Sequence, residues 1–344
     1  MFFCDPPGHT GQEHLFNLGH NDVMETDYVF FHDQEPVDAD LYDPLFRDVI
    51  RRNLDISDNT LGHVVVSERG HNVQTLKEKY GWQTHYYFYH GWACLDWFRG
   101  YDHTYLIDRA EDRTPTQTFI SPNRIVGGQR NHRVLFLYHV YKQGLQNNHI
   151  SAPRTCPAEG VDIDSIAQKY TNVYQDIGKV FEKADLPRLF SGEEVQKMTS
   201  CWLGNFIEAS DSLLYVPTET VYFGRRTHIT EKTFKAIALE MPFVLVAPAG
   251  SLEYLREYGF KTFAGVLDES YDQETNDILR VEMVVKLLKD IDQLSVRERQ
   301  QIHRHMLPMV QHNYHHFYHG GFRDLLWNEL QGMLNNLQTC ISND

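Results

Sequence analysis

The sequence predicts an α/β protein in which two domains each contain a parallel sheet covered by helices. Short apolar runs alternate with helical segments, and runs that are apolar throughout are typical of parallel strands buried on both faces. The chain has 344 residues, 42% of them hydrophobic and 13% aromatic, which is enough for two separate cores. A polar stretch at 109–118, which contains Pro115, separates two series of strands. We therefore expect an N-terminal domain over residues 1–115 and a C-terminal domain over residues 116–344.

Three apolar runs predict the sheet of the N-terminal domain, at residues 28–31, 62–68 and 85–90. Residues 76–80 and the aromatic-rich segment 92–101 are expected to be helical. In open parallel sheets, ligands bind beyond the carboxyl ends of the strands. The polar residues that follow these strands are therefore candidates for a site: Asp33, Glu35, Glu68 and His90.

The C-terminal domain is predicted to begin with a strand at 118–121, a loop containing glycines and arginines, and a helix at 134–145. Such an arrangement is typical of a phosphate-facing turn. Further strands are expected at 212–220, 243–246 and 262–263, and residues 161–200 are expected to be mostly helical, with a helix cap at 191–195. Amphipathic helices are predicted at 278–294 and 296–307, and Pro308 should end or kink the second.

The segment from His228 to Val246 is the most informative part of the chain. It predicts a loop, a helix that starts near Glu231, a break at Pro242 and a buried strand. A helix start offers unpaired N–H groups and partial positive charge, so it favours phosphate binding. Lys232 adds a full positive charge, and the Glu231 carboxylate can accept hydrogen bonds from sugar hydroxyls. The segment therefore predicts a nucleotide-sugar site, with His228 in the preceding loop.

This segment resembles the donor-binding motif of the α1,3-fucosyltransferases, and more closely that of the fucosyltransferase-like glycosyltransferases of bacteriophages and bacteria. The similar residues are Thr230-Glu231-Lys232, the apolar helix and the Pro-Phe-Val-Leu-Val strand, and the match extends over 218–280, with a weaker match over 118–145. The resemblance implies the GT-B fold, two Rossmann-like domains that face each other across a cleft. It also implies inverting transfer of fucose or a similar sugar from a nucleoside-diphosphate sugar, GDP-fucose in the named family, to a glycan or another hydroxyl acceptor.

The family also suggests roles for single donor-site residues. An arginine at a helix start reaches the donor pyrophosphate in the family; Arg133 takes that place here, and Arg130 is the competing alignment. A glutamate at a strand end lies at the donor sugar in the family, and Glu219 takes its place, although a threonine follows it where the family has asparagine. Arg225 and Arg226 lie in the next loop, where a diphosphate would meet them.

An inverting transfer needs a carboxylate that takes the proton of the acceptor hydroxyl. The family places this base in the N-terminal domain. Glu35 is our candidate, because it follows a predicted strand in a loop expected to face the cleft. Asp33 and Glu68 stay open as alternatives.

Composition narrows the cofactors and partners. A formal net charge of −15 argues against an extended basic face for nucleic acid. Five scattered cysteines without CxxC spacing favour reduced thiols in a cytoplasm. The resemblance implies that this is the cytoplasm of a bacterial or phage-infected cell. The first residues lack a basic, apolar leader, and no window approaches the ~20 apolar residues of a membrane span. We expect neither a signal peptide nor a membrane anchor.

A metal site is not expected. The Asp-x-Asp spacing occurs at 38–40, 162–164 and 290–292, but none of these follows an apolar strand directly. His312 and His316 share a helix spacing without a further ligand nearby. We predict that no cofactor is required and that lysine and arginine neutralise the pyrophosphate. Two alternative functions stay open: a phage glycosyltransferase that modifies DNA, and a non-catalytic sugar-binding virion protein.

Overall fold

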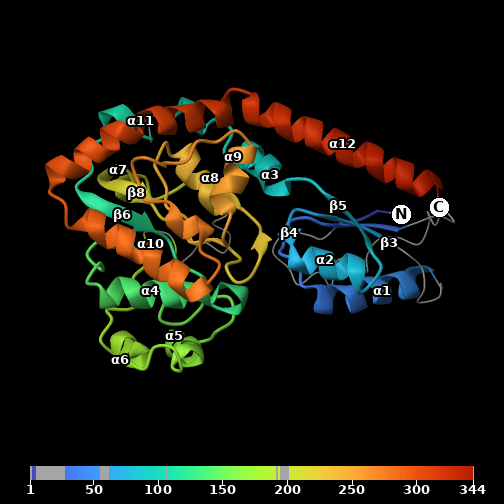
Figure 1. The fold of residues 1–344 in the computed structure, drawn as a ribbon, viewed down its shortest axis with the longest axis horizontal. Coiled ribbons are helices and arrows are strands. Elements are labelled where there is room, and N and C mark those ends of the chain that lie inside the picture. Colours follow the sequence, from blue (N-terminus) through green and yellow to red (C-terminus); the bar gives the residue numbers. More distant parts are fainter. Residues whose placement is uncertain are drawn as a thin grey trace. The chain divides into compact units, whose positions relative to one another are not determined.

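The computed structural model describes residues 2–4, 28–54, 62–104, 107–190, 193 and 201–343. The protein is α/β and contains parallel sheets, as predicted (Figure 1). Its contacts divide the chain into two compact units. Unit 1 comprises Met1–Ala93, Arg225–His228 and Arg323–Asp344; unit 2 comprises Cys94–Gly224 and Ile229–Phe322. The first division thus falls between residues 93 and 94, whereas the sequence suggested a boundary between 115 and 116.

Unit 1 is built on a four-stranded parallel sheet. Its strands, in spatial order, are β1 (Phe2–Cys4), β2 (Tyr28–His32), β3 (Gly62–Val66) and β5 (Gln83–Tyr86). Helices α1 (Ala39–Leu54) and α2 (His71–Glu78) cover one face, and α12 (Gly321–Asn343) covers the other. Alternate residues of β3 serve the two faces: Val64 and Val66 pack toward α1 and α2, and Val65 packs toward Met333 of α12. This double burial explains the continuous apolar runs.

Two local features of unit 1 differ from the expectation. The strand expected at 85–90 ends at Tyr86, and α3 (Tyr89–Trp97) begins three residues later. The backbone N–H of Tyr89 donates to the Ser67 hydroxyl at 3.0 Å, which turns the chain out of the sheet. The short strands β4 (Arg69–Gly70) and β9 (Arg226–Thr227) pair antiparallel, which is why residues 225–228 belong to unit 1.

Unit 2 contains a parallel sheet in the order β7-β6-β8, formed by β7 (His149–Ile150), β6 (Gln117–Ser121) and β8 (Ser212–Tyr215). Residues 242–246 continue it beyond β8, because the N–H of Val244 donates to the Tyr215 carbonyl and that of Val246 to the Pro217 carbonyl. Helices α4 (His132–Lys142) and α10 (Asp277–Asp292) pack together, with α10 against β6. Helices α8 (Glu231–Ala238) and α11 (Val296–Tyr318) pack together, with α11 against β8.

The remaining helices of unit 2 are short. They are α5 (Ile163–Ala167), α6 (Ile177–Glu182), α7 (Phe206–Asp211) and α9 (Ser251–Glu257), with 3-10 turns at Tyr101–His103, Ala110–Asp112, Gly128–Arg130, Gln168–Tyr170 and Ser270–Gln273. The helix cap expected at 191–195 lies outside the described residues except for Glu193.

One prediction about unit 2 was wrong, and another was wrong in one of its two alternatives. Residues 262–263 form no strand, because the N–H of Phe263 donates to the Glu269 carboxylate instead of to a neighbouring strand. Pro308 does not end its helix: α11 continues through it to Tyr318. Met306 and Val310, on either side of the proline, are buried, so tertiary packing holds the helix together where the proline removes one N–H donor.

Across the described residues, we find no helix that combines the length and the apolar character needed to cross a membrane.

Candidate functional site

The chain connections of unit 2 bring two helix starts to one edge of its sheet. β6 leads through a loop into α4 and then β7, and residues 216–230 lead from β8 into α8 and then into 242–246. In such β-α-β units each helix begins at the carboxyl end of the preceding strand. The glycine- and arginine-containing loop before α4 and the Thr-Glu-Lys turn before α8 therefore lie on the same side of the sheet.

The Glu219 carboxylate organises the start of α8. It is completely buried and accepts three hydrogen bonds: from the Thr230 backbone N–H at 3.2 Å, the Thr230 hydroxyl at 2.6 Å and the Thr233 hydroxyl at 2.6 Å. A carboxylate at a helix N-terminus satisfies N–H groups that have no partner within the helix and interacts favourably with the helix dipole. Glu219 is thus the cap of α8, and the Thr230 side chain does not cap the helix itself.

Lys232 is the cation at this helix start. Its ammonium group donates to the Glu231 carboxylate at 2.8 Å, the Thr220 hydroxyl at 3.0 Å and the Thr230 hydroxyl at 3.1 Å. The Lys232 side chain is 23% exposed and that of Glu231 is 11% exposed, whereas Glu219 is completely buried. Of the three, Lys232 is therefore the side chain most accessible to a ligand.

Arg133 joins the two helix starts. Its guanidinium donates to the backbone carbonyls of Thr218 at 2.6 Å and Glu219 at 3.3 Å, and to that of Ile125 at 2.7 Å. Arg133 is 3% exposed, and burial, with Arg130 nearby, lowers its pKa to about 9. Because its guanidinium is buried and already donates to three backbone carbonyls, Arg133 is poorly available to a ligand.

Arg130 lies in the 3-10 turn before α4 and is half-buried. Its guanidinium has no hydrogen bond or ion pair to any described residue. Of the two arginines considered for the pyrophosphate, Arg130 is therefore the more available cation, although the sequence favoured Arg133.

Side-chain hydrogen bonds fix the loops at the strand ends. The Thr218 hydroxyl donates to the Asn123 side-chain carbonyl at 2.9 Å, and the Asn123 amide donates back to the Ser121 carbonyl at 3.0 Å. The N–H of Asn123 donates to the Ser151 hydroxyl at 2.9 Å, which ties in the end of β7. All four residues are buried, so the edge that carries both helix starts is preorganised.

Packing fixes the orientation of α8. Phe234 lies among Phe260, Phe317 and Phe322, with ring centroids 5.4–5.8 Å away. At the other end of the helix, Glu240 takes a left-handed conformation with φ 54°. A clamp holds this turn: Arg109 and the N–H of Ala110 donate to the Glu240 carboxylate, and Arg113 donates to the carbonyls of Leu239 and Glu240.

Three predicted donor residues belong to unit 1 and lie in the loop after the Glu219 strand. Arg226 donates to the buried Glu68 carboxylate at 2.6 Å and to the Val37 carbonyl at 3.1 Å. His228 is buried, with Nδ1 3.4 Å from the Ser67 carbonyl. Arg225 is exposed, and its backbone carbonyl accepts from the N–H of His71. These contacts hold β9 within unit 1.

Three carboxyl groups lie beyond the carboxyl ends of β2 and β3. Asp33 is buried and accepts from the Tyr87 hydroxyl at 2.5 Å, and burial raises its pKa. Burial also raises the pKa of Glu68, whose Oε2 accepts from Arg226 while its Oε1 has no partner among the described residues. Glu35 is half-buried, with no side-chain hydrogen bond or ion pair within the described ranges. Glu35 is therefore the most accessible of the three.

The side chains considered for metal binding have structural partners. His312 and His316 donate from Nε2 to the backbone carbonyls of Gly259 and Tyr258, at 3.0 and 2.7 Å. Asp38 accepts from the N–H of Leu41 at the start of α1, and Asp40 accepts from the Tyr80 hydroxyl. In the described part of the chain, no three His, Cys, Asp or Glu side chains gather as a metal site would require.

Sequence reasoning missed the threonines that bind Glu219 and the buried Asn123. A signal for the first was present, because Thr230 and Thr233 flank Glu231-Lys232 at a predicted helix start, where hydroxyl side chains commonly form capping bonds. Asn123 gave no such signal, because its partners Ser121, Ser151 and Thr218 come from three separate strand ends.

Comparison of the chain with protein-family models, curated proteins and solved structures finds no match to any of them.

Proposed function

We propose that this protein is a glycosyltransferase that binds a nucleoside-diphosphate sugar at the start of α8 and transfers the sugar to a hydroxyl acceptor. One observation carries the proposal: Arg133 ties the loop that bears Arg130 to the Glu219 turn, so that Arg130 and Lys232 belong to one preorganised edge. Two cations beside two helix starts suit a diphosphate, which carries several negative charges and many acceptor oxygens.

In the proposed complex, Lys232, Arg130 and the N–H groups at the start of α8 bind the diphosphate. A phosphate oxygen replaces one threonine hydroxyl as the partner of the Lys232 ammonium, a favourable exchange because the phosphate is charged. The Glu231 carboxylate, whose side chain is 11% exposed, accepts a hydrogen bond from a sugar hydroxyl. As the sugar–oxygen bond breaks, the same cations stabilise the charge that develops on the leaving diphosphate. We propose that no metal is required for this step.

The chemistry that we propose is inverting displacement by a protein of the GT-B class. The acceptor oxygen attacks C1 of the sugar as the bond from C1 to the diphosphate breaks, and Glu35 takes the proton of the acceptor hydroxyl. We choose Glu35 over Asp33 and Glu68 because those two carboxyls are held by Tyr87 and Arg226. GDP-fucose is the first donor to test.

Two residues have different roles here from those that the resemblance implies. Glu219 is completely buried and supports α8 and Lys232 from behind instead of contacting the sugar. Arg133 is a positioning residue, and Arg130 contacts the diphosphate in its place. Arg225, Arg226 and His228 belong to unit 1, where the Arg226 ion pair with Glu68 holds the loop.

The proposal is tested by turnover of a panel of GDP- and UDP-sugars, by hydrolysis and by transfer to simple glycan acceptors, with EDTA present. We expect at least one donor to be turned over, and Lys232→Ala and Arg130→Ala to reduce the rate by about two orders of magnitude or more. Glu35→Gln should abolish transfer without weakening donor binding. Lys179→Ala, an exposed lysine on α6, is the matched control and should keep full activity. Equal turnover by the wild type and Lys232→Ala would refute the proposal.

A further inference from the structure

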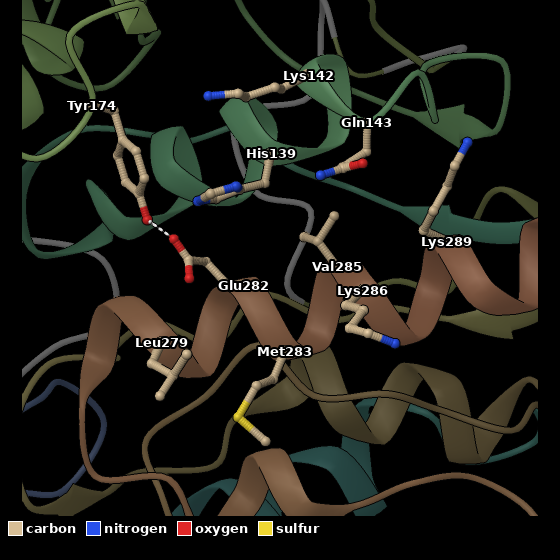
Figure 2. A pocket seen from close by; sticks show the side chains of 10 residues that line it. All are labelled: His139, Lys142, Gln143, Tyr174, Leu279, Glu282, Met283, Val285, Lys286 and Lys289. Carbon is tan, nitrogen blue, oxygen red and sulfur yellow. Dashed lines mark hydrogen bonds between the residues drawn. The ribbon is translucent and has the colours of Figure 1, made fainter.

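A pocket of about 450 Å³ opens on unit 2 between the last turns of α4 and one face of α10 (Figure 2). Its volume falls in the range of small-molecule sites in proteins. The donor residues proposed above lie elsewhere: Arg130 and Arg133 precede or begin α4, whereas the pocket residues of this helix are His139, Lys142 and Gln143 at its other end. The proposed function therefore does not account for this pocket.

The lining is cationic in a chain with a net charge of −15. It includes three lysines, Lys142, Lys286 and Lys289, against one acid, Glu282. Lys142 pairs with Asp176 at 3.0 Å and Lys286 with Asp290 at 2.5 Å. The Lys289 ammonium group has no ion pair or hydrogen bond with any residue that the structure describes. Lys289 is half-buried, and because the other two lysines are paired with carboxylates it is the lining cation most available to an anionic ligand.

The other lining residues supply apolar and aromatic surface. Leu279, Met283 and Val285 come from α10, and Tyr174 contributes its ring and donates its hydroxyl to Glu282 at 2.5 Å. In Figure 2, His139 and Tyr174 lie near Glu282 at one end, Gln143 and Lys289 lie at the other, and Val285 lies between them. A ligand that spans the pocket therefore meets cationic and amide groups at one end and rings at the other.

His139 provides an independent sign of a missing partner. It is 7% exposed, its ring packs edge-on against Tyr174 at 4.8 Å, and its buried Nε2 has no hydrogen-bond partner among the described residues. Burial lowers its pKa to about 4, so the ring is neutral near pH 7. A buried polar atom without a partner costs free energy, and a ligand group that reaches it would recover this cost.

We propose that this pocket, formed by Lys289, Gln143, His139 and the apolar side chains of α10, is a second ligand site that binds a small organic anion. The ligand carries one carboxylate or phosphate, bound by Lys289 and the Gln143 amide, on a ring-sized apolar body that packs over Val285. A polar atom on the far side of the ring pairs with Nε2 of His139. Neither the anionic group alone nor the apolar ring alone satisfies both ends of the pocket.

Binding is tested with two fluorinated probes, fluorobenzoate and fluorophenyl phosphate, by the line width and shift of their fluorine NMR signals. Fluorobenzamide and inorganic phosphate, which lack the charge or the ring, are the control ligands. The variants are Lys289→Glu, which reverses the charge, and Met283→Trp, which fills the pocket from a half-buried position. Lys179→Glu is the control for a change of charge outside the pocket. Circular dichroism establishes that each variant is folded.

We expect at least one anionic probe to bind the wild type and Lys179→Glu equally, in the millimolar range or more tightly. Lys289→Glu and Met283→Trp should each weaken this binding by about tenfold or more, because a charge-assisted contact or the ring site is lost. The benzamide and inorganic phosphate should bind at least about tenfold more weakly than the probe. The proposal is overturned if neither anionic probe binds the wild type, or if either pocket variant binds the probe as well as the wild type does. It is also overturned if the benzamide binds as well as the probe, or if Lys179→Glu loses probe binding. The outcome is independent of donor turnover.

Discussion

Replacement of Glu219 by alanine should destabilise unit 2. The substitution removes the acceptor of three hydrogen bonds and leaves the Thr230 N–H and the hydroxyls of Thr230 and Thr233 without their partner. The position is completely buried, so water does not readily replace the carboxylate. The Lys232 ammonium also loses support, because the Thr230 hydroxyl links it to Glu219.

Hydrogen bonds to a charged group each contribute about 1.5–3 kcal/mol, and loss of several from one group is less than additive. We therefore expect Glu219→Ala to lower the free energy of unfolding by about 3–5 kcal/mol. Since 1 kcal/mol shifts the midpoint by about 2–4 °C in a domain of this size, the expected fall in Tm is about 6–20 °C. Glu219→Gln keeps the shape and one acceptor oxygen, so it should cost only about 1–2 kcal/mol.

Hydrogen–deuterium exchange read by mass spectrometry measures where the loss occurs. Peptides that cover α8 should exchange faster in Glu219→Ala, whereas peptides from β2 and β3 of unit 1 should be unchanged. Glu182→Ala, an exposed acid on α6, is the control and should stay within about 0.5 kcal/mol of the wild type. A Glu219→Ala protein as stable as this control, with α8 equally protected, would refute the capping role.

Three further changes test other parts of the fold. Burial lowers the pKa of His303 from 6.5 to about 4, so this histidine is protonated more readily in the unfolded chain than in the folded protein. The free energy of unfolding should therefore fall by up to about 3 kcal/mol between pH 6.5 and 4. Thermal unfolding of His303→Gln should show a smaller fall over the same pH range. Arg226→Ala leaves the Glu68 carboxylate buried without a cation and should lower the free energy of unfolding in urea by about 3–5 kcal/mol. Adding Glu68→Gln to this variant should restore part of the lost stability. An Arg226→Ala protein as stable as the wild type would contradict the pairing. Pro308→Ala returns an N–H donor to the exposed side of α11 and should raise the free energy of unfolding by about 1–3 kcal/mol; a lower melting temperature would show that the proline is needed.

The parallel sheets were predictable because local pattern determines them. Val64, Val65 and Val66 alternate between two covered faces, so the run is apolar throughout, which is the signal that the sequence carries. The helix at 134–145 and the Thr-Glu-Lys turn were found for similar reasons, since hydrophobic pattern and residues at the helix start mark both. The path through Pro308 was not predictable locally, because distant side chains bury Met306 and Val310.

The division into compact units and the roles of single arginines depend on contacts between distant segments. Arg226 belongs to unit 1 because its strand pairs with β4 and its guanidinium meets Glu68, 158 positions away in the chain. The sequence favoured Arg133 over Arg130 for the pyrophosphate, but in the fold Arg133 donates to the carbonyls of Thr218 and Glu219, 85 and 86 positions away. The loop could therefore be predicted from residue type and spacing. Which of its arginines is available to a ligand depends on contacts with distant residues and could not be predicted.

The central claim is that Lys232 and Arg130 form one diphosphate site in unit 2, and calorimetric titration with GDP and UDP tests it most directly. With EDTA present, we predict that at least one nucleotide binds the wild type and Lys179→Gln with equal affinity, in the micromolar range. Lys232→Gln and Arg130→Gln should each bind about tenfold more weakly or worse, because each loses a charged partner of the phosphates. Failure of both nucleotides to bind the wild type, or unchanged affinity in both variants, would contradict the account.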